Sequence, residues 1–398
     1  MKELKMTKTV LLGDIAEKIT KGTTPTTYGA SFTDSGVNFI KVESITDQGG
    51  FLVDKFVHID EETHKSMLKR SIIEQGDILL TMAGAIGRVA QVPSEILPAN
   101  TNQAVSIIRI NSEEVDKRYV RYFLQSPSAK SQFNGGITQS AQPNLSLGNI
   151  SKIKMPLPEI RIQKKIAGIL GTIDEKIALN QRINETLEKI GQTLFKHYFI
   201  TNPERKNWDI HVLSDFGEII CGKTPPKAKL EYFGGDTPFI KIPDMHGQTF
   251  IVRTQDSLTI AGRDYQPTKT LPPGSICVSC IATVGLVSIT ATLSQTNQQI
   301  NSLVPKQGSS TYYLYFALKL MRDELISIAS SGSATPNMNT SIFSKIKLIM
   351  PSKIYLEEFY SLVRPVFKQI LINQNTNMIL ADLRDSLLPR LISGRIRA

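Results

Sequence analysis

The chain has 398 residues, which is long enough for two ordinary domains. A composition of 41% hydrophobic and 21% charged residues excludes a disordered chain, and no apolar run reaches the roughly 18 residues that a membrane-spanning helix needs. The net charge of +10 suits an acidic partner such as nucleic acid, although a mixed, solvated surface explains it equally well.

The cysteines and the first residues indicate a cellular setting. Three cysteines, an odd number, predict no disulfide framework. The opening MKELKMTKTV has no long apolar stretch after its lysines and does not predict a signal peptide. We therefore expect a cytoplasmic protein with no membrane partner.

Similar blocks of sequence occur in the same order in both halves of the chain. In chain order the pairs are KGTTP (21–25) with GKTPP (222–226), VNFIKV (37–42) with TPFIKI (237–242), QGDILLTMAGAIGRV (75–89) with PGSICVSCIATVGLV (273–287), TNQ (101–103) with TNQ (296–298), and QPNLSLGNISKIKMPLP (142–158) with TPNMNTSIFSKIKLIMP (335–351). Preserved order over so many blocks indicates an internal duplication.

Each half begins with a mixed α and β pattern. Residues 37–42 and 237–242 are short β-rich runs, and the runs that follow the turn glycines Gly76 and Gly274 resemble buried strands. Residues 116–126 and 311–321 are apolar at helical spacing and predict helices. The predicted class is α+β, with two similar mixed α/β domains, each around a mixed or curved sheet.

Each half ends in a long heptad pattern that predicts a coiled-coil seam. The predicted seam residues, seven apart, are Ile166, Ile173, Asn180, Leu187 and Leu194 in the first half and Phe359, Val366, Asn373, Leu380 and Leu387 in the second. The companion apolar residues, three positions after a seam residue, are Ile169, Ile183, Ile190, Leu362 and Leu383. Two unrelated amphipathic helices, each packed on its own domain, would be the alternative.

The shared asparagines favour a paired coil. Asn180 in LNQRIN and Asn373 in INQNTN hold equivalent seam positions, where a lone Asn lowers stability but specifies register. We expect the two helices to be antiparallel and the asparagines to meet near the middle. A helix of about 35–40 residues spans roughly 55–60 Å and suits a spacer. The predicted boundaries are 1–158 and 202–351 for the domains, and 159–201 and 352–398 for the helices.

The sequence contains no recognisable catalytic motif. It lacks a phosphate-binding loop, an H-E-x-x-H motif and a glycine-rich turn for a dinucleotide or S-adenosylmethionine. PPG at 272–274 lacks the Asn/Asp-Pro-Pro-aromatic order of amino-group DNA methyltransferases. Cys277 and Cys280 form one C-x-x-C, but their repeat partners are Leu79 and Met82, so we interpret them as core residues. We predict no catalytic residues and no metal site.

Four segments resemble the specificity subunit of type I restriction–modification systems. They are GDILLTMAGAIG (76–87), PLPEIRIQKKIAGIL (156–170), LFKHYF (194–199) and LLPRLISGRI (387–396). The order of domain, helix, domain and helix is also similar, and the resemblance covers essentially the whole chain. The segment 352–363 departs from the pattern because it lacks the basic cluster of the first helix entry.

The resemblance implies a non-catalytic protein within a site-specific adenine methyltransferase and ATP-dependent endonuclease complex. Each domain would recognise one half of a bipartite target in double-stranded DNA. The two helices would form an antiparallel coiled coil that sets the half-site spacing and docks two methyltransferase subunits. Restriction subunits would join them. S-adenosylmethionine, ATP and Mg would be bound by those partners, and no cofactor by this chain.

Candidate DNA-binding residues are those with donors suited to bases or phosphates. They are Lys21, Thr23, Thr24, Lys41, Arg88, Lys223, Thr224, Lys227, Lys229, Lys241, Arg253, Arg263 and Lys269. Ordinary roles compete with each of them: a polar surface loop for the Lys/Thr-rich segments, the solvent face of a strand for Lys41 and Lys241, and a surface arginine for Arg88. We expect sequence preference to lie where the halves diverge, at 43–70 and 244–270.

The repeated Thr-Asn-Gln has the chemistry to bind adenine, but residues shared by both halves are poor readers of different half-sites. We therefore favour a structural amide network for Asn102, Gln103, Asn297 and Gln298. Pro143-Asn144 and Pro336-Asn337 predict turns. Two other functions stay open at this point: a methyltransferase or nuclease with an unrecognised site, and a dimeric scaffold that never contacts DNA.

Overall fold

The computed structural model describes residues 8–136, 144–330 and 336–397, so that Pro143 of the first predicted turn lies outside the described residues. The chain divides into two units. Unit 1 consists of residues 1–175 and 381–398, and unit 2 consists of residues 176–380. Both long helices contribute one part to each unit.

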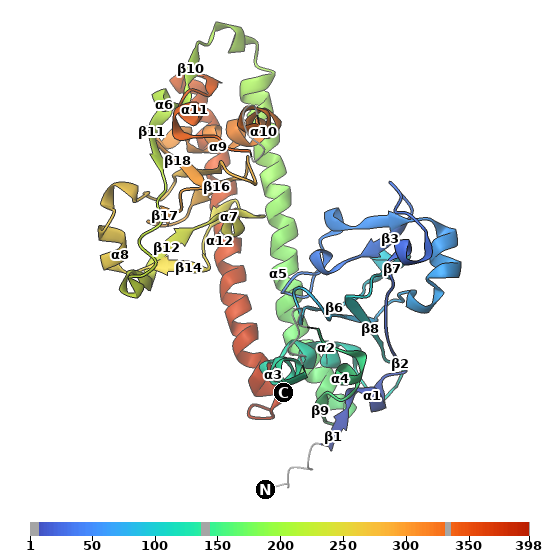
Figure 1. Cartoon of the computed structure of the whole chain (residues 1–398). Coiled ribbons are helices and arrows are strands. Elements are labelled where there is room, and N and C mark those ends of the chain that lie inside the picture. Colours follow the sequence, from blue (N-terminus) through green and yellow to red (C-terminus); the bar gives the residue numbers. More distant parts are fainter. Residues whose placement is uncertain (1–7, 137–143, 331–335, 398) are drawn as a thin grey trace. The chain divides into compact units, whose positions relative to one another are not determined.

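Unit 1 is built on two small sheets and a strand pair (Figure 1). Its four-stranded antiparallel sheet has the order β2 (Lys18–Lys21), β8 (Val105–Arg109), β5 (Ile78–Thr81) and β6 (Val89–Gln91). The second sheet has the order β4 (Val57–Ile59), β3 (Val37–Ile40) and β7 (Ala99–Thr101), and β1 (Lys8–Leu11) pairs with β9 (Lys154–Leu157). In the second sheet β3 is antiparallel to β4 and parallel to β7.

Unit 2 repeats this topology and adds one strand. Its larger sheet has the order β11 (Gly217–Cys221), β18 (Ile300–Pro305), β15 (Ile276–Ser279), β16 (Val287–Thr290) and the additional β13 (Phe250–Ile251). The other strands are β14 (Asp256–Leu258), β12 (Phe233–Ile240) and β17 (Gln295–Thr296) in one sheet, and the pair β10 (Ile210–Val212) and β19 (Lys347–Ile349). The same sheet orders in both units confirm the duplication and the predicted mixed sheets.

The strand predictions hold except at one end. All residues of β5 and of β15 are buried, as expected for strands inside a core, and each follows a turn glycine, Gly76 with φ 84° and Gly274 with φ 86°. In contrast, β3 and β12 end at Ile40 and Ile240, so Lys41 and Lys241 lie beyond the strands. Each lysine instead begins a short helix, η2 (Val42–Ser44) or α7 (Ile242–Met245).

Helices cover the sheets where the sequence pattern predicted them. In unit 1, α2 (Lys117–Gln125) begins after Asp116, whose carboxylate accepts hydrogen bonds from the backbone N–H groups of Arg118 and Tyr119. Its counterpart in unit 2 is α9 (Thr311–Leu320). The other α-helices are α1 (Leu12–Ile15), α3 (Pro127–Gly136), α4 (Leu147–Ser151), α6 (Leu213–Phe216), α8 (Ile260–Asp264), α10 (Arg322–Ser330) and α11 (Thr340–Ser344).

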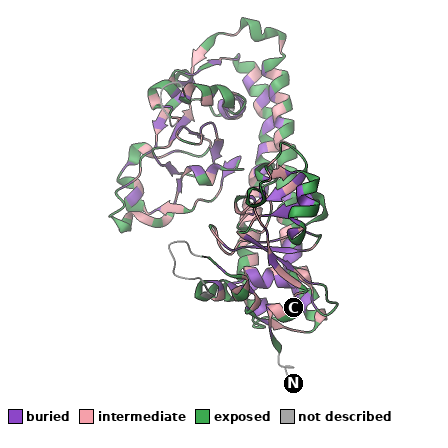
Figure 2. Ribbon diagram, turned by 45° about the vertical axis from the view of Figure 1, so that its right-hand side comes forward, coloured by how far each residue is buried: buried purple, intermediate pink, exposed green. Residues whose placement is uncertain are grey.

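Each unit has its own core, and both long helices, α5 (Ile160–Phe195) and α12 (Lys353–Ile392), contribute to both cores. In unit 1, Ile166 and Leu391 pack in one apolar cluster with residues of β5 and α2. In unit 2, Phe195, Phe359 and Phe367 pack with residues of β15 and α9. Figure 2 shows the resulting pattern of buried strands and buried helix faces, with exposed residues on loops and outer faces.

The predicted seam residues are buried or half-buried. Their companions, however, were assigned to the wrong stripe, since Ile169, Ile183, Ile190, Leu362 and Leu383 are 37–46% exposed. The stripe that packs lies four residues after each seam position and includes Leu170, Gly191 and Ile370. At Gly191 an added Cβ would lie 2.8 Å from the Phe316 ring, which explains why this position of the stripe is a glycine.

Four asparagines join the two helices within unit 2. Asn180 Nδ2 donates to Asn377 Oδ1, and Asn373 Nδ2 donates to Asn184 Oδ1, both at 2.8 Å. The sequence predicted that the two seam asparagines would meet, but they do not bond to each other. Each bonds instead to another asparagine of the opposite helix. The crossed pairing confirms that the helices are antiparallel.

Unit 1 has an ionic counterpart to the asparagine pairs. The Asp174 carboxylate on α5 accepts hydrogen bonds from Arg384 of α12 at 3.0 Å, and from Arg121 and Tyr122 of α2 at 3.0 and 2.7 Å. Among the described residues, no helix is both long enough and apolar enough to cross a membrane.

Candidate nucleic-acid interface

In unit 1, the loop after β2 packs directly against the Thr-Asn-Gln turn. The N–H of Thr23 donates to the Thr101 carbonyl at 3.1 Å, and the Thr24 hydroxyl donates to Gln103 Oε1 at 2.5 Å. Gly22 allows this approach, because a Cβ there would lie 1.8 Å from the Thr101 carbonyl oxygen. Backbone contact at this distance excludes any side chain, so the glycine is required by packing.

Unit 2 repeats the arrangement. The N–H of Lys223 donates to the Thr296 carbonyl at 2.9 Å, and the Thr224 hydroxyl donates to Gln298 Oε1 at 2.7 Å. A Cβ on Gly222 would lie 2.1 Å from the Asn297 carbonyl oxygen. We call residues 22–24 with 101–103, and residues 222–224 with 296–298, the Thr–Gln clasps.

The clasps correct the alignment of the two halves by one residue. The block alignment of KGTTP with GKTPP placed Lys21 opposite Gly222, whereas the hydrogen bonds make Gly22 equivalent to Gly222. Thr23 is consequently equivalent to Lys223, and Thr24 to Thr224. The threonines thus have the same partner in both units, while the charge beside them comes from different positions.

Basic side chains surround the clasp in unit 1. Arg70 is exposed, and its Nη2 donates to the Thr23 hydroxyl at 3.3 Å, while its carbonyl accepts from Lys18 Nζ at 2.9 Å. Lys21 is half-exposed at the end of β2. Arg70 lies at the end of the divergent segment 43–70 but is not among the predicted residues, because its contact with the clasp is formed only by the fold. It belongs to η5 (Lys69–Ser71), which contacts β2.

Unit 2 also places cations near its clasp. Lys223 and Lys227 are exposed, and Lys269 ends η10 (Pro267–Lys269), which contacts β11. Lys229 is more constrained: its ammonium donates to the Tyr232 hydroxyl at 3.2 Å, and that hydrogen bond raises the pKa of the lysine. All four remain candidates for DNA contact.

The repeated amides divide into two classes. Oδ1 of Asn102 accepts from the Ala104 N–H, and Oδ1 of Asn297 accepts from the Gln299 N–H, both at 3.1 Å, so the predicted structural role is confirmed for the asparagines. Gln103 and Gln298 differ, because both are exposed and each bonds to a clasp threonine. Asn144 and Asn337, which were predicted to lie in turns, form β-bridges with Ala83 and Ile281.

Three candidates are engaged inside the fold. Lys241 forms an ion pair with Asp256, and Lys41 Nζ lies 4.6 Å from the centre of the Phe32 ring. Arg88 pairs with Asp47, with Nε 2.8 Å from Oδ1, and its Nη1 donates to the Ile45 carbonyl at 3.0 Å. Arg88 precedes β6 and holds the 42–47 loop, so the geometry favours a structural role for it over base contact.

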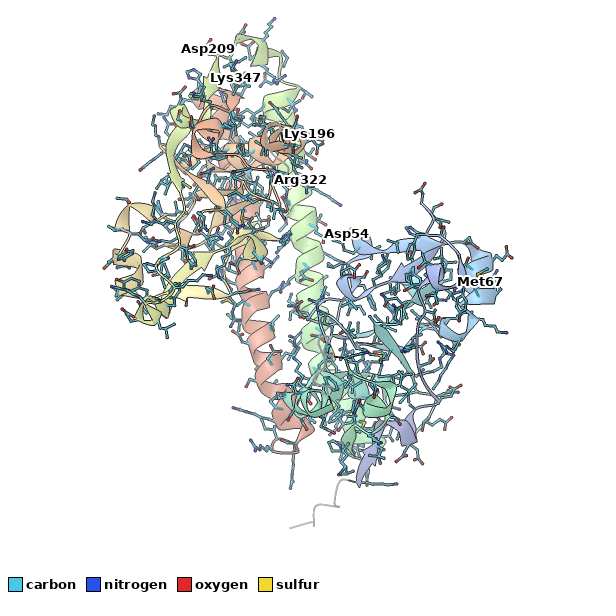
Figure 3. All side chains as sticks on the ribbon, in the orientation of Figure 1. Asp54, Met67, Lys196, Asp209, Arg322 and Lys347 are labelled. Carbon is cyan, nitrogen blue, oxygen red and sulfur yellow. The ribbon has the colours of Figure 1, made fainter. Side chains whose placement is uncertain are left out.

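Both divergent segments contain exposed side chains. Figure 3 labels Asp54 and Met67, both exposed residues of the 43–70 segment of unit 1. In the 244–270 segment of unit 2, Arg253 is exposed, and Arg263 pairs with Asp264 at 2.8 Å, a hydrogen bond that raises the pKa of its guanidinium. Their contact with DNA stays a prediction.

Cys277 and Cys280 are core residues, as predicted from their repeat partners. Both are buried, and burial raises the pKa of Cys277 to about 12 and that of Cys280 to about 11. Both thiols therefore stay protonated at neutral pH, which is unsuitable for a nucleophile or a metal ligand. Within 8–136, 144–330 and 336–397, no three His, Cys, Asp or Glu side chains gather in a way that would hold a metal ion.

Comparison with known proteins identifies the duplicated unit. The model of the type I restriction modification DNA specificity domain matches twice, at residues 5–189 and 205–377. The type I restriction enzyme HindI specificity subunit of Haemophilus influenzae is 35% identical, over 87% of this chain and 93% of that protein. The MjaIX specificity subunit of Methanocaldococcus jannaschii is 26% identical, over 96% of this chain and 92% of that protein.

A solved structure agrees on the fold. The crystal structure of a type I restriction–modification S subunit from M. genitalium has a TM-score of 0.56 at 13% identity, covering 97% of this chain and 96% of that one. The duplicated mixed domains and long helices are thus those of the family. The chain belongs to the type I restriction–modification specificity subunits, the non-catalytic DNA-recognition components of these enzymes.

Proposed function

We propose that each unit recognises one half of a bipartite target in double-stranded DNA. The observation that carries this proposal is the repetition of the same sheet orders in two units, each matched separately by the specificity-domain model. One module present twice suits a ligand whose equivalent faces recur along its length, as those of duplex DNA do about every 34 Å. Two linked modules also raise affinity through effective concentration.

The charges and the divergence between the halves support this assignment. The chain carries a net charge of +10, and basic side chains lie beside both clasps. The segments 43–70 and 244–270 differ in sequence and present exposed side chains. Shared elements would contact what both half-sites have in common, and divergent ones would distinguish their bases.

The long helices would dock two methyltransferase subunits and set the spacing of the half-sites, with restriction subunits joining the complex. Exposed apolar residues on these helices support docking. Within unit 2 they are Leu179, Ile183 and Ile190 on α5 and Leu362 and Ile372 on α12. Large apolar side chains in such number on a helix surface are typical of an interface. S-adenosylmethionine, ATP and Mg would be bound by these partners, with methylation at adenine N6.

A methylation map tests the proposal. The chain is co-expressed with its neighbouring methyltransferase subunit in a methylation-free host, and the genome is sequenced by a method that detects N6-methyladenine. We expect a split motif with an unread spacer and one modified adenine in each half, on opposite strands. The methyltransferase subunit expressed alone is the control and should leave the genome unmodified.

Two results would contradict the proposal in different ways. A continuous motif would exclude recognition of two separated half-sites. An assembled complex that binds DNA and leaves the genome unmethylated would exclude the methylating role and keep only DNA binding.

A further inference from the structure

We propose that Gln103 and Gln298 are equivalent DNA-backbone contacts: each donates an amide N–H to a phosphate, one in each half-site, and positions its unit without reading a base. This inference rests on the proposed function. It assigns a role to the two exposed glutamines of the repeated Thr-Asn-Gln, whereas the asparagines of the same motif are half-buried or buried and accept a hydrogen bond at Oδ1 within their turns.

The hydrogen bond within each clasp selects what the glutamine offers to a ligand. In both units a threonine hydroxyl donates to Oε1, at 2.5 Å for Gln103 and 2.7 Å for Gln298. Neither Nε2 has a protein partner among the described residues. Adenine recognition uses the amide oxygen and nitrogen together, while a phosphate needs only a donor. An exposed amide whose oxygen is already bonded is therefore better suited to a phosphate.

The duplication supports the same conclusion. Gly22, Thr24 and Gln103 correspond to Gly222, Thr224 and Gln298, with matching hydrogen bonds. Identical groups in identical geometry have the same base preference, so they do not distinguish two different half-sites. The sugar–phosphate backbone is the part of the ligand that every half-site shares.

The electrostatic surroundings are also similar in effect, although different residues provide them. In unit 1 the guanidinium of Arg70 donates to the Thr23 hydroxyl. In unit 2 the residue equivalent to Thr23 is Lys223, whose own side chain is charged and exposed. A cation beside a neutral amide donor is a usual composition for a phosphate contact. The two units share the neutral glutamine donor, while the residue that carries the charge differs between them.

The clasp is also rigid enough to position a ligand. Its two loops are in direct backbone contact at Gly22 and Gly222, where no Cβ fits. The threonine bond further restricts the glutamine rotamers, so less side-chain entropy remains to be lost on binding. These features favour a contact that fixes the placement of the DNA in the same way in both units.

The test measures binding of the full chain in its methyltransferase complex to a labelled random-sequence duplex of about 40 base pairs, long enough for both units. The variants are Gln103→Ala, Gln298→Ala and the double variant. The matched controls are Gln75→Ala in unit 1 and Gln307→Ala in unit 2, both exposed glutamines outside the clasps. Fluorescence anisotropy is recorded at several KCl concentrations.

We expect each single clasp variant to bind about 3–10-fold more weakly, as for loss of an ordinary solvent-accessible hydrogen bond. The double variant should weaken binding by about the product of the two single effects. The salt dependence should be unchanged, since glutamine is neutral. In contrast, Arg70→Gln and Lys223→Gln should each reduce the slope of log K against log[KCl] by about 0.9. The controls should bind like the unmodified chain.

Isosteric variants protect the test against misfolding. Gln103→Glu and Gln298→Glu keep an oxygen for the threonine hydroxyl but replace the donor by a negative charge. They should therefore retain the melting temperature of the unmodified chain and bind DNA more weakly than the alanine variants. Tight binding by these carboxylate variants would overturn the inference.

The outcomes separate this inference from the proposed function. If the unmodified complex binds DNA and the clasp variants bind equally well, the phosphate contact is refuted and the proposed function stands. If the unmodified complex binds neither this duplex nor one that carries the motif found in the methylation map, the proposed function itself fails. A methylation map of Gln103→Ala gives a further decision: the same motif at lower occupancy is expected, while a relaxed base in one half would show base reading instead.

Discussion

The two units form the same glycine turn before their central strands but stabilise it with different chemistry. In unit 1, Asp77 follows Gly76, is 2% exposed, and accepts two hydrogen bonds from Arg109, at 2.9 Å from Nε and 2.8 Å from Nη2. In unit 2, Ser275 follows Gly274 and donates to the Pro272 carbonyl at 2.8 Å, while its N–H donates to the Thr290 hydroxyl at 3.0 Å.

The strand registers show that these are equivalent positions. Ile78 pairs with Ile108 and Ile276 pairs with Leu303, so β18 carries Val304 where β8 carries Arg109. The backbone conformation is preserved because the positive φ of Gly76 and of Gly274 is a constraint of the fold. The side chains below the turn are free to change as long as buried polar groups are satisfied. Structural duplication therefore persists with little identity between the halves.

The largest expected effect comes from removing the two turn side chains. Asp77→Ala leaves the Arg109 guanidinium, whose side chain is 14% exposed, paired only with the exposed carboxylate of Glu74. The loss of the buried partner should lower the free energy of unfolding of unit 1 by up to about 3–5 kcal/mol. Ser275→Ala should lower that of unit 2 by only about 1 kcal/mol. Hydrogen exchange with mass spectrometry, followed on peptides from β5 and β15, measures the two separately.

A compensating variant makes the first prediction sharper. Asp77→Ala combined with Arg109→Leu removes both charges and should recover much of the lost stability, because a buried ion pair replaced by apolar groups is often neutral. Equal losses in the two units, or no recovery in the double variant, would show that the buried ion pair is not what distinguishes them.

A smaller difference is expected between the two asparagine pairs of unit 2. Asn180→Ala and Asn373→Ala each remove one bond between the helices and should each lower stability by about 1–3 kcal/mol. The loss should be greater for Asn373, because its Oδ1 also accepts from Gln369 Nε2 at 2.9 Å. Double-mutant cycles with Asn377→Ala and Asn184→Ala, read from denaturant unfolding, measure each coupling energy, and absent coupling would refute the pairing.

The smallest expected effect is a selective response of unit 1 to acid. His64 is buried, and its Nδ1 lies 3.3 Å from the Asn100 amide nitrogen, whereas the buried amide Gln295 of unit 2 bonds to Thr270, Gln266 and the Arg263 carbonyl without a histidine. Burial and then Lys65 lower the pKa of His64, and Glu61 opposes them. The folded unit thus disfavours the charged imidazole.

The sign of the pH effect follows from linkage. The unfolded chain takes up this proton near the ordinary histidine pKa of about 6.5, while the folded chain does so only at lower pH. The contribution of His64 to stability is therefore complete above about pH 6.5 and declines as the pH falls below it. Hydrogen exchange is measured at pH 7.5 and 5.5 and corrected for intrinsic rates. The increase in opening on going from pH 7.5 to 5.5 should be larger in β3 and β7 than in β12 and β17. His64→Gln should remove that difference, and its persistence in the variant would assign it to another group.

The candidate site illustrates what a sequence pattern leaves open. Lys41, Lys241 and Arg88 have the composition of DNA contacts, but Lys241 pairs with Asp256 and Arg88 with Asp47 in the fold. Arg70 belongs to the divergent segment 43–70, but no sequence feature distinguished it from the other residues there, and it lies beside the clasp. A basic residue in a sequence is equally suited to an internal carboxylate and to a phosphate. Only the position of the neighbouring acidic groups distinguishes the two.

The sequence alone determined the duplication, the buried strands, the two long helices and the family, because these depend on local spacing and on the order of blocks along the chain. Only the tertiary structure decided which helix stripe packs, which asparagines pair, and that Thr24 meets Gln103 and Thr224 meets Gln298. Periodicity is a property of neighbouring residues, which fixes the type of each element. Hydrogen-bond partners from distant parts of the chain are selected when the backbones approach, and here that approach depends on the absence of a side chain at Gly22 and Gly222.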